Sequence, residues 1–256
     1  MIINNNISAI NTRNQLFSTN AATSKSMEKL SSGKRINRAA DDAAGLSISE
    51  KMRAQIRGMN QATRNAQDGI SLIQTAEGAL DEVSNMLVRL KELNVQKLNG
   101  TYDTDTDTVN LDLEITQLGL EIASIYENTK FNGKTVLSTT AITLAISENG
   151  LVKLAVKGGS LATITSASTV GVIEAAITDV NELRATFGSQ QNRLESTVRN
   201  LKTTAENLQA AESRIRDTDM AEEMSNFTKN NILVQAGTAM LAQANQAPQN
   251  VLSLLR

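Results

Sequence analysis

The longest unbroken pattern in the sequence is an apolar stripe that runs from about residue 43 to residue 98. Its members recur at alternating spacings of four and three, which is the period of one helix face: Met52, Ile56, Met59, Thr63, Ala66, Ile70 and Ile73. The chain's single proline, Pro248, lies far from this stretch, so nothing interrupts a helix there. We therefore expect one helix about 80 Å long at 1.5 Å per residue, and with it a rod-like molecule.

Two further segments suit helices packed beside the first. Residues 109–126 carry a shorter apolar stripe, which predicts a helix antiparallel to the long one. Residues 171–215 hold a near-perfect heptad through Val180, Leu183, Phe187, Leu194, Val198, Leu201, Ala205, Leu208 and Ile215. Aromatic residues make up only 2% of the chain, so aliphatic side chains must form the core. The sequence therefore predicts a mainly α fold, an elongated antiparallel bundle or coiled coil.

The two ends of the chain carry thinner stripes. The last thirty residues place Leu233, Ala236, Met240, Ala244, Ala247, Val251 and Leu254 on one helix face, and the first thirty place Ile3, Ile7, Ile10, Phe17 and Ala21 on another. We expect these two stripes to pair with each other. Because both are rich in Ala, Asn and Gln, the pair would bury little, and further copies of the chain would supply the missing partner.

Two short segments break the helical pattern. Residues 31–45 contain Ser-Ser-Gly, a basic cluster and then Asp41 and Asp42, which we interpret as helix N-terminal capping rather than as a catalytic carboxylate pair. No complementary acid, base or metal ligand lies nearby. Residues 216–223 form the second break, with Thr218 or Asp219 as the cap of the last helix. Pro248 is expected to end or kink that helix.

A β-hairpin is predicted at about residues 131–157. The stretch FNG at 131–133 signals a turn, alternating apolar residues follow, and Asn149-Gly150 is a two-residue hairpin turn. Two strands alone are marginally stable, so the hairpin must lean on the helices. The Ser/Thr-rich segment 160–169 is expected to be a surface loop, and the place most suited to O-linked modification or to an inserted domain.

Composition argues against several classes of function. With no His and no Cys, the chain lacks the usual general base and the usual zinc ligands, so we expect no enzyme and no cofactor. The polar segment 101–108 lacks the Gly and Glu of a calcium loop, so we expect no metal. A net charge of −2 argues against binding to nucleic acid, and no apolar run is long enough to cross a bilayer. The N-terminus does not resemble a secretory signal peptide.

The sequence closely resembles bacterial flagellin. The resemblance is carried by the start MIINNNISAINTRNQL and by two blocks, residues 30–80 (LSSGKRINRAADDAAGLSISEKMRAQIRGMNQATRNAQDGISLIQTAEGAL) and residues 192–256, which include AESRIRDTDMAEEMSNFTKNNILVQAGTAMLAQANQAPQNVLSLLR. It implies that residues 1–42 and 218–256 form a terminal layer that lines the inner tube and becomes ordered on assembly. Residues 43–217 would form a rod-like second layer with the hairpin, and no large outer variable domain would be present.

The resemblance also implies function and partners. The chain would self-assemble into the extracellular flagellar filament and serve motility, after export in unfolded form by the flagellar type III apparatus. Its partners would be further copies, the filament cap protein, hook–filament junction proteins and an export chaperone. The terminal helix of this family is bound by that chaperone and read by host NAIP sensors, which implicates Leu233, Met240, Val251, Leu252, Leu254 and Leu255; their other role is packing in the filament core, together with Ile3, Ile7, Ile10 and Phe17.

A second host sensor is implied by residues 87–96, LVRLKELNVQ, which resemble the segment that Toll-like receptor 5 recognises. Arg89 and Leu93 match that motif and Glu114 matches its third contact. Lys91 stands where the family has Arg, which loses a bidentate fork and could weaken recognition. The alternative is that these are exposed residues on core helices.

The sequence leaves alternatives to a filament subunit. A hook–filament junction protein shares similar ends and is the main alternative. A coiled-coil receptor rod would need a membrane span or a receptor tip, and a flagellin with a zinc protease domain would need His, which is absent. Deleting residues 227–256 is expected to leave a soluble chain that cannot polymerise, and electron microscopy would distinguish filament from soluble protein.

Overall fold

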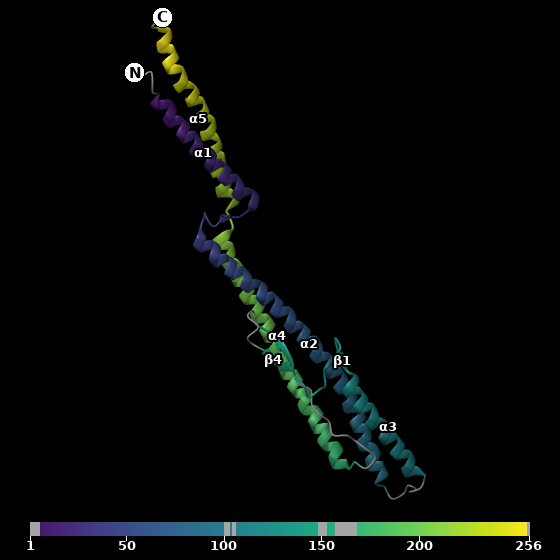
Figure 1. Ribbon diagram of the computed structural model, residues 1–256. Helices are drawn as coiled ribbons and strands as arrows, with labels where there is room; N and C mark the ends of the chain where they lie inside the picture. The colour runs from purple at the N-terminus through teal and green to yellow at the C-terminus, as the bar shows by residue number, and fades with distance from the viewer. Residues whose placement is uncertain (1–5, 100–102, 104–105, 148–152, 157–167, 255–256) are drawn as a thin grey trace. The chain divides into compact units, whose positions relative to one another are not determined.

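The computed structural model describes residues 6–99, 103, 106–147, 153–156 and 168–254. Five helices dominate these residues (Figure 1): α1 (Ile7–Ser32), α2 (Ala43–Lys97), α3 (Asp107–Asn128), α4 (Val170–Arg216) and α5 (Met220–Leu254). Four short strands lie between α3 and α4: β1 (Lys130–Phe131), β2 (Lys134–Thr135), β3 (Ile142–Ala145) and β4 (Lys153–Val156). The predicted fold class, mainly α with a small β-hairpin, is confirmed.

The chain divides into two compact units. Unit 1 combines the two ends of the chain, Met1–Arg53 and Leu208–Arg256, and unit 2 is Ala54–Asn207. The division falls inside α2 and inside α4. Within the described parts of the chain, no helix is long and apolar enough to cross a membrane.

Unit 2 contains the hydrophobic core. Three helices supply most of it. Their buried residues lie on one helix face, three or four positions apart on α2 and seven apart on α3 and most of α4: Leu80, Val83, Leu87, Leu90 and Leu93 from α2, Ile115 and Ile122 from α3, and Ile173, Val180, Phe187 and Leu194 from α4. The strand region contributes three further buried residues to this core, Val136, Leu137 and Ile146. Helices α2 and α3 lie side by side in this unit (Figure 1).

The strand region forms two antiparallel pairs, β1–β2 and β3–β4. Asn132 and Gly133 connect β1 to β2 with φ values of 49° and 78°, the two-residue turn that the FNG stretch predicted. Ala145 pairs with Lys153, whereas an uninterrupted two-residue turn at Asn149-Gly150 would place Ala145 opposite Leu154. That predicted turn, half of the segment 101–108 and residues 160–167 lie outside the described residues.

Strand β3 packs directly on α2. A hairpin that is only marginally stable alone requires such support from the helices. The Asn65 side-chain amide donates to the carbonyl of Ala145 at 2.9 Å. At Gly69 of α2, the Leu144 side chain approaches so closely that a Cβ there would collide with its Cδ1. Gly69 therefore makes room for the strand on the helix.

The last helix departs from one prediction. Pro248 lies inside α5, which continues to Leu254, so of the two effects expected of this proline, an end or a kink, the end of the helix is not observed. A proline removes one helical N–H donor and leaves the hydrogen bonds on either side of it in place, and a helix long enough to hold many such bonds tolerates that loss.

Candidate functional site

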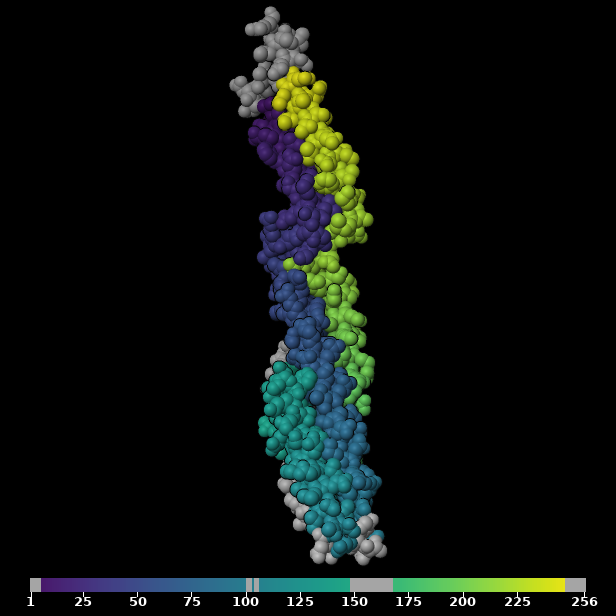
Figure 2. Space-filling model, turned by 90° about the vertical axis from the view of Figure 1, so that its right-hand side faces the viewer, coloured from purple at the N-terminus to yellow at the C-terminus, as the bar shows by residue number. Residues whose placement is uncertain are grey.

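The ends of the chain form an antiparallel helix pair, α1 with α5 (Figure 1). Their contacts run in opposite order along the two helices. The Asn6 amide donates to the carbonyl of Ala244 at 2.7 Å, and a Cβ on Gly237 would lie 3.3 Å from Cδ1 of Leu16. Lys29 then reaches Glu223, with Nζ and Oε2 3.5 Å apart. Figure 2 shows the two helices in contact along this length.

The faces that meet in this pair are small and partly polar. On α1 the less exposed residues recur at helical spacing, and Thr19 and Ser26 are buried: Ala9, Thr12, Leu16, Thr19, Thr23, Ser26 and Leu30. On α5 the corresponding residues are Glu223, Phe227, Asn230, Val234, Gly237, Leu241 and Ala244. The pair therefore buries few large side chains.

The hydroxyl groups on the α1 face are satisfied within the helix. Thr12 donates to the carbonyl of Ser8 at 2.8 Å, and Thr19 and Thr23 donate at 2.9 Å to the carbonyls of Gln15 and Thr19. A buried hydroxyl that keeps a hydrogen bond avoids the penalty of desolvation. These small side chains can therefore lie against α5 although they are polar, which apolar periodicity alone does not reveal.

The large residues of the predicted apolar stripes lie outside this interface, although Ala244 belongs to it, so direct pairing of the two stripes within one chain is wrong. Ile7, Ile10 and Phe17 on α1 are 59%, 44% and 67% exposed, and Leu233 and Met240 on α5 are 46% and 62% exposed. The helices meet instead through neighbouring positions, where small residues let the backbones approach. Ile3 and Leu255 lie outside the described residues, and for Val251, Leu252 and Leu254 the structure describes the helix but not the side chains.

An open groove of about 450 Å³ follows the α1–α5 seam. Its lining combines apolar side chains with uncharged polar ones: Asn11, Thr12, Gln15, Leu16, Thr19, Leu233, Ala236, Gly237 and Met240. The groove is thus lined on one side by residues of the predicted C-terminal stripe and on the other by the interface face of α1.

The chain segments that connect these helices to α2 and α4 are tied together by backbone hydrogen bonds. Lys34 and Asp217 form an antiparallel bridge, the Arg35 N–H donates to the carbonyl of Arg216 at 2.7 Å, and the Thr218 N–H donates to the carbonyl of Gly33 at 3.1 Å. The Arg35 guanidinium also donates to the carbonyl of Ile215 at 2.6 Å, which satisfies a carbonyl at the end of α4.

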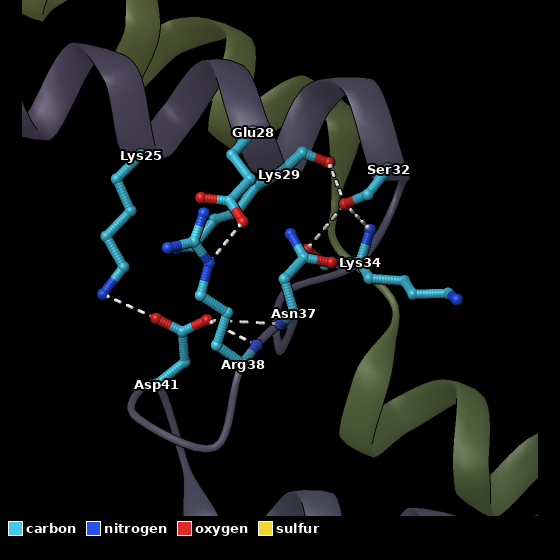
Figure 3. Close-up of polar contacts among 8 residues, drawn as sticks. All are labelled: Lys25, Glu28, Lys29, Ser32, Lys34, Asn37, Arg38 and Asp41. Carbon is cyan, nitrogen blue, oxygen red and sulfur yellow. Dashed lines mark hydrogen bonds and ion pairs between the residues drawn. The ribbon is translucent and has the colours of Figure 1, made fainter.

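Asp41 organises the connection from α1 to α2 (Figure 3). Its carboxylate accepts the backbone N–H groups of Asn37 at 3.2 Å and Arg38 at 3.1 Å, and it lies 2.9 Å from Nζ of Lys25. The hydrogen bond from Lys25, followed by those from the backbone, lowers the pKa of Asp41 from 3.8 to about 2. Arg38 pairs in turn with Glu28 at 3.0 Å.

Of the predicted helix caps, Asp42 and Asp219 are confirmed, whereas Asp41 accepts N–H groups of the connecting segment and does not cap α2. Asp42 accepts the N–H of Gly45 at 2.8 Å at the start of α2. At the start of α5 the cap is Asp219 rather than Thr218, because its carboxylate accepts the N–H groups of Ala221 at 2.9 Å and Glu222 at 3.3 Å. The carboxylates at both breaks therefore accept hydrogen bonds from backbone N–H groups.

The residues that resemble a receptor motif lie in unit 2. Arg89 and Glu114 are exposed and joined by hydrogen bonds of 3.2 Å and 3.0 Å from Nε and Nη2 of Arg89, which also reaches Glu92 at 3.3 Å. These bonds, that to Glu114 foremost, raise the pKa of Arg89. Leu93 is only 1% exposed and belongs to the core, so the expectation that it offers a contact surface is not met.

Known proteins match the chain along nearly its whole length. The profile of the bacterial flagellin N-terminal helical region matches residues 3–141, and that of the bacterial flagellin C-terminal helical region matches residues 170–255. The flagellins of Bacillus subtilis and Halalkalibacterium halodurans are 49% and 50% identical, each over 100% of both chains. The flagellar filament 33 kDa core protein of Treponema phagedenis is 47% identical, also over 100% of both. A crystal structure of Bacillus cereus flagellin, 35% identical, covers 58% of this chain and 94% of its own, with a TM-score of 0.48.

Proposed function

The chain belongs to the bacterial flagellin family and is a structural subunit of the bacterial flagellar filament, and we propose that unit 1 carries the surface through which it polymerises. The filament serves motility and lies outside the cell. The relatives described above are flagellins and a filament core protein, so they support the filament subunit over the hook–filament junction protein.

The exposure of large apolar side chains on α1 and α5 carries this proposal. Among the unit 1 residues whose side chains the structure describes, Ile36 is the only apolar one that is buried. Ile7, Phe17, Ile232 and Met240 are each more than half exposed, although the two helices are already paired. Apolar patches of this kind mark interaction sites, and in a homopolymer the partner is a further copy. A contact between two different faces propagates a helical filament when its rotation does not close into a ring.

The polymerising role of α5 can be tested by changing exposed residues that are not needed for the helix pair. The double variant Leu233→Ser, Met240→Ser is expected to stay helical and monomeric, because both side chains are largely exposed in the single chain. Sedimentation and electron microscopy should then show loss of filaments, as for the deletion of residues 227–256. The matched control Gln235→Ser, Gln243→Ser changes exposed polar positions on the same helix and should polymerise. A normal filament yield from the first variant would contradict the proposal.

The same family membership supports a route of assembly. Residues 1–42 and 218–256 would form the inner layer and become ordered on assembly, because unit 1 buries too little apolar surface to offset the entropy of ordering its ends. The chain would be exported unfolded by the flagellar type III apparatus with its terminal helix held by a chaperone. It would then be added beneath the cap protein, on a filament that starts at the hook–filament junction proteins.

Recognition by host sensors is a further part of the proposal. Two observations support a contact of Arg89 and Glu114 with Toll-like receptor 5, namely their exposure and their position side by side on α2 and α3. Leu93 would contribute by packing beneath them. The C-terminal residues Val251, Leu252, Leu254 and Leu255 would be read by NAIP sensors once the chain is unassembled.

Arg89→Ala is expected to lower signalling through Toll-like receptor 5 without affecting the fold, because the Arg89 side chain is half exposed and its partners Glu92 and Glu114 are exposed carboxylates. Receptor reporter assays on purified variants measure the effect, and circular dichroism checks the helices. Arg64→Ala, a change at another exposed arginine of α2, serves as the control. Equal signalling by both variants would remove Arg89 from the contact.

A further inference from the structure

We propose that peroxide oxidises the exposed methionines of α1 and α5 to sulfoxides in the unassembled chain, and that the sulfoxide at Met240 blocks polymerisation. This inference rests on the polymerising role proposed for unit 1. It assigns to Met240 a reversible modification that decides whether a chain can be added to a filament.

The composition of the chain directs peroxide to methionine. The chain has no Cys, no Trp and no His, and it has eight Met. A lone pair of the thioether sulfur attacks one oxygen of hydrogen peroxide, so that an S–O bond forms as the O–O bond breaks. The second oxygen takes the proton of the first and leaves as water. The sulfur loses two electrons to the peroxide, and the product is a polar sulfoxide that methionine sulfoxide reductases convert back with thiols.

The methionines whose side chains the structure describes fall into two groups by exposure. On α2, Met59 is only 6% exposed, and Met52 and Met86 are partly buried. Because oxidation requires peroxide to reach the sulfur, the more exposed group should react first. That group belongs to the two end helices, and its members are between 48% and 62% exposed: Met27, Met220, Met224 and Met240.

Met240 is the member of this group whose oxidation matters most for assembly. It is the most exposed of the four and lines the α1–α5 groove. The α5 residues beside it in the groove, Leu233, Ala236 and Gly237, offer no side-chain donor to a sulfoxide oxygen. A polar group that is buried without a hydrogen bond costs free energy. A neighbouring copy can therefore cover the thioether of Met240 more easily than its sulfoxide.

The same change should cost the single chain little. The side chain of Met240 faces solvent there, so water can donate to the sulfoxide oxygen. The contacts that join α1 to α5 run through other residues, among them Asn6 with Ala244 and Lys29 with Glu223. An oxidised chain is thus expected to stay folded in unit 2, to keep its helix pair, and to lose only the ability to be covered by a further copy.

Brief treatment of the unassembled full-length chain with hydrogen peroxide, stopped by catalase, tests the proposal. Trypsin releases Met240 and Met59 in separate peptides with one methionine each, so mass spectrometry reads the oxidation of each one directly. Met240 is expected to gain oxygen well before Met59. The critical concentration for polymerisation should rise at least about tenfold, as expected when a polar group is buried in place of an apolar one. Methionine sulfoxide reductase with a thiol should restore the original value without any change of sequence.

Two leucine variants identify the methionine responsible, since leucine has a similar volume and cannot form a sulfoxide. Each is compared with itself before and after peroxide. The critical concentration of Met240→Leu should change little on treatment, whereas that of Met59→Leu should rise as it does for the unaltered chain. Equal oxidation of Met59 and Met240, an unchanged critical concentration after oxidation, a loss that persists after reduction, or equal sensitivity of the two variants would each overturn the proposal. The untreated chain forms filaments in all these cases, whereas its failure to polymerise would instead refute the proposed function.

Discussion

At the scale of single residues, carboxylates hold the backbone where helices break. Asp42 and Asp219 each accept N–H groups at a helix start, and Asp41 accepts two from the connecting segment while it pairs with Lys25. Helix starts leave N–H groups without intrahelical partners, and a nearby carboxylate supplies the missing acceptor. These aspartates thereby set the course of the chain between α1 and α2 and between α4 and α5.

The lowered pKa of Asp41 makes its contribution depend on pH. The folded value is about 2 and the ordinary value is 3.8, so the stabilisation is fully present above about pH 4 and is lost as the pH falls toward 2. Asp41→Asn keeps an acceptor oxygen and removes the charge. The difference in melting temperature between the two proteins should therefore be constant from pH 7 to about 4 and shrink below it.

Circular dichroism melts at a series of pH values measure this difference. Asp68→Asn, at an exposed carboxylate of α2, is the control and should melt close to the unaltered chain. A difference for Asp41→Asn that stays constant down to pH 2 would show that the charge of Asp41 is not what stabilises the connection.

At this scale, hydrogen bonds between residues close in the sequence could be predicted. Pairs of residues that are distant in the sequence could not. An aspartate just before a helical stripe predicts an N-terminal cap. Asp42 could therefore be predicted as the cap of α2, and Asp219 was one of two candidates for the cap of α5. The pairing of Asp41 with Lys25 depends on how α1 returns toward its connector, which no local pattern encodes. A motif match likewise aligned Leu93 with a contact residue, but the match does not say that its side chain points into the core.

At the scale of elements, glycines of α2 that look alike in the sequence differ in their surroundings. A Cβ at Gly78 would meet nothing within 4 Å, whereas at Gly69 it would collide with Cδ1 of Leu144. Gly78→Ala is expected to stabilise the protein by about 1 kcal/mol, because alanine is the better helix former. Gly69→Ala should gain nothing or lose stability, since Leu144 must move and β3 with it. Chemical denaturation of both variants measures the difference, and equal stabilisation would mean that β3 does not pack closely on α2.

The helices themselves were predictable because long, unbroken periodicity decides them. The expected segments 43–98, 109–126 and 171–215 became Ala43–Lys97, Asp107–Asn128 and Val170–Arg216. The face that each end helix turns to its partner was not predictable in the same way. Periodicity ranks Ile7, Ile10 and Phe17 as the buried side, but Thr19, Thr23 and Ser26 are less exposed than these residues. All three are small, and the hydroxyls of Thr19 and Thr23 bond within their own helix.

At the scale of the whole molecule, the two units differ in how much they bury. The buried core cluster consists of unit 2 residues from α2, α3, α4 and the strand region. In the described part of unit 1, the apolar side chains of α1 and α5 are mostly exposed. A single copy is therefore well packed in unit 2 and incomplete in unit 1, which is the distribution expected of a subunit that finishes folding in a polymer.

A cryo-electron microscopy structure of filaments grown from this chain tests that account most directly. It should show Ile7, Phe17, Leu233 and Met240, exposed in the single copy, buried against neighbouring copies, with α1 and α5 still paired. Filaments in which these four side chains remain open to solvent, while unit 2 makes all the contacts between copies, would contradict it.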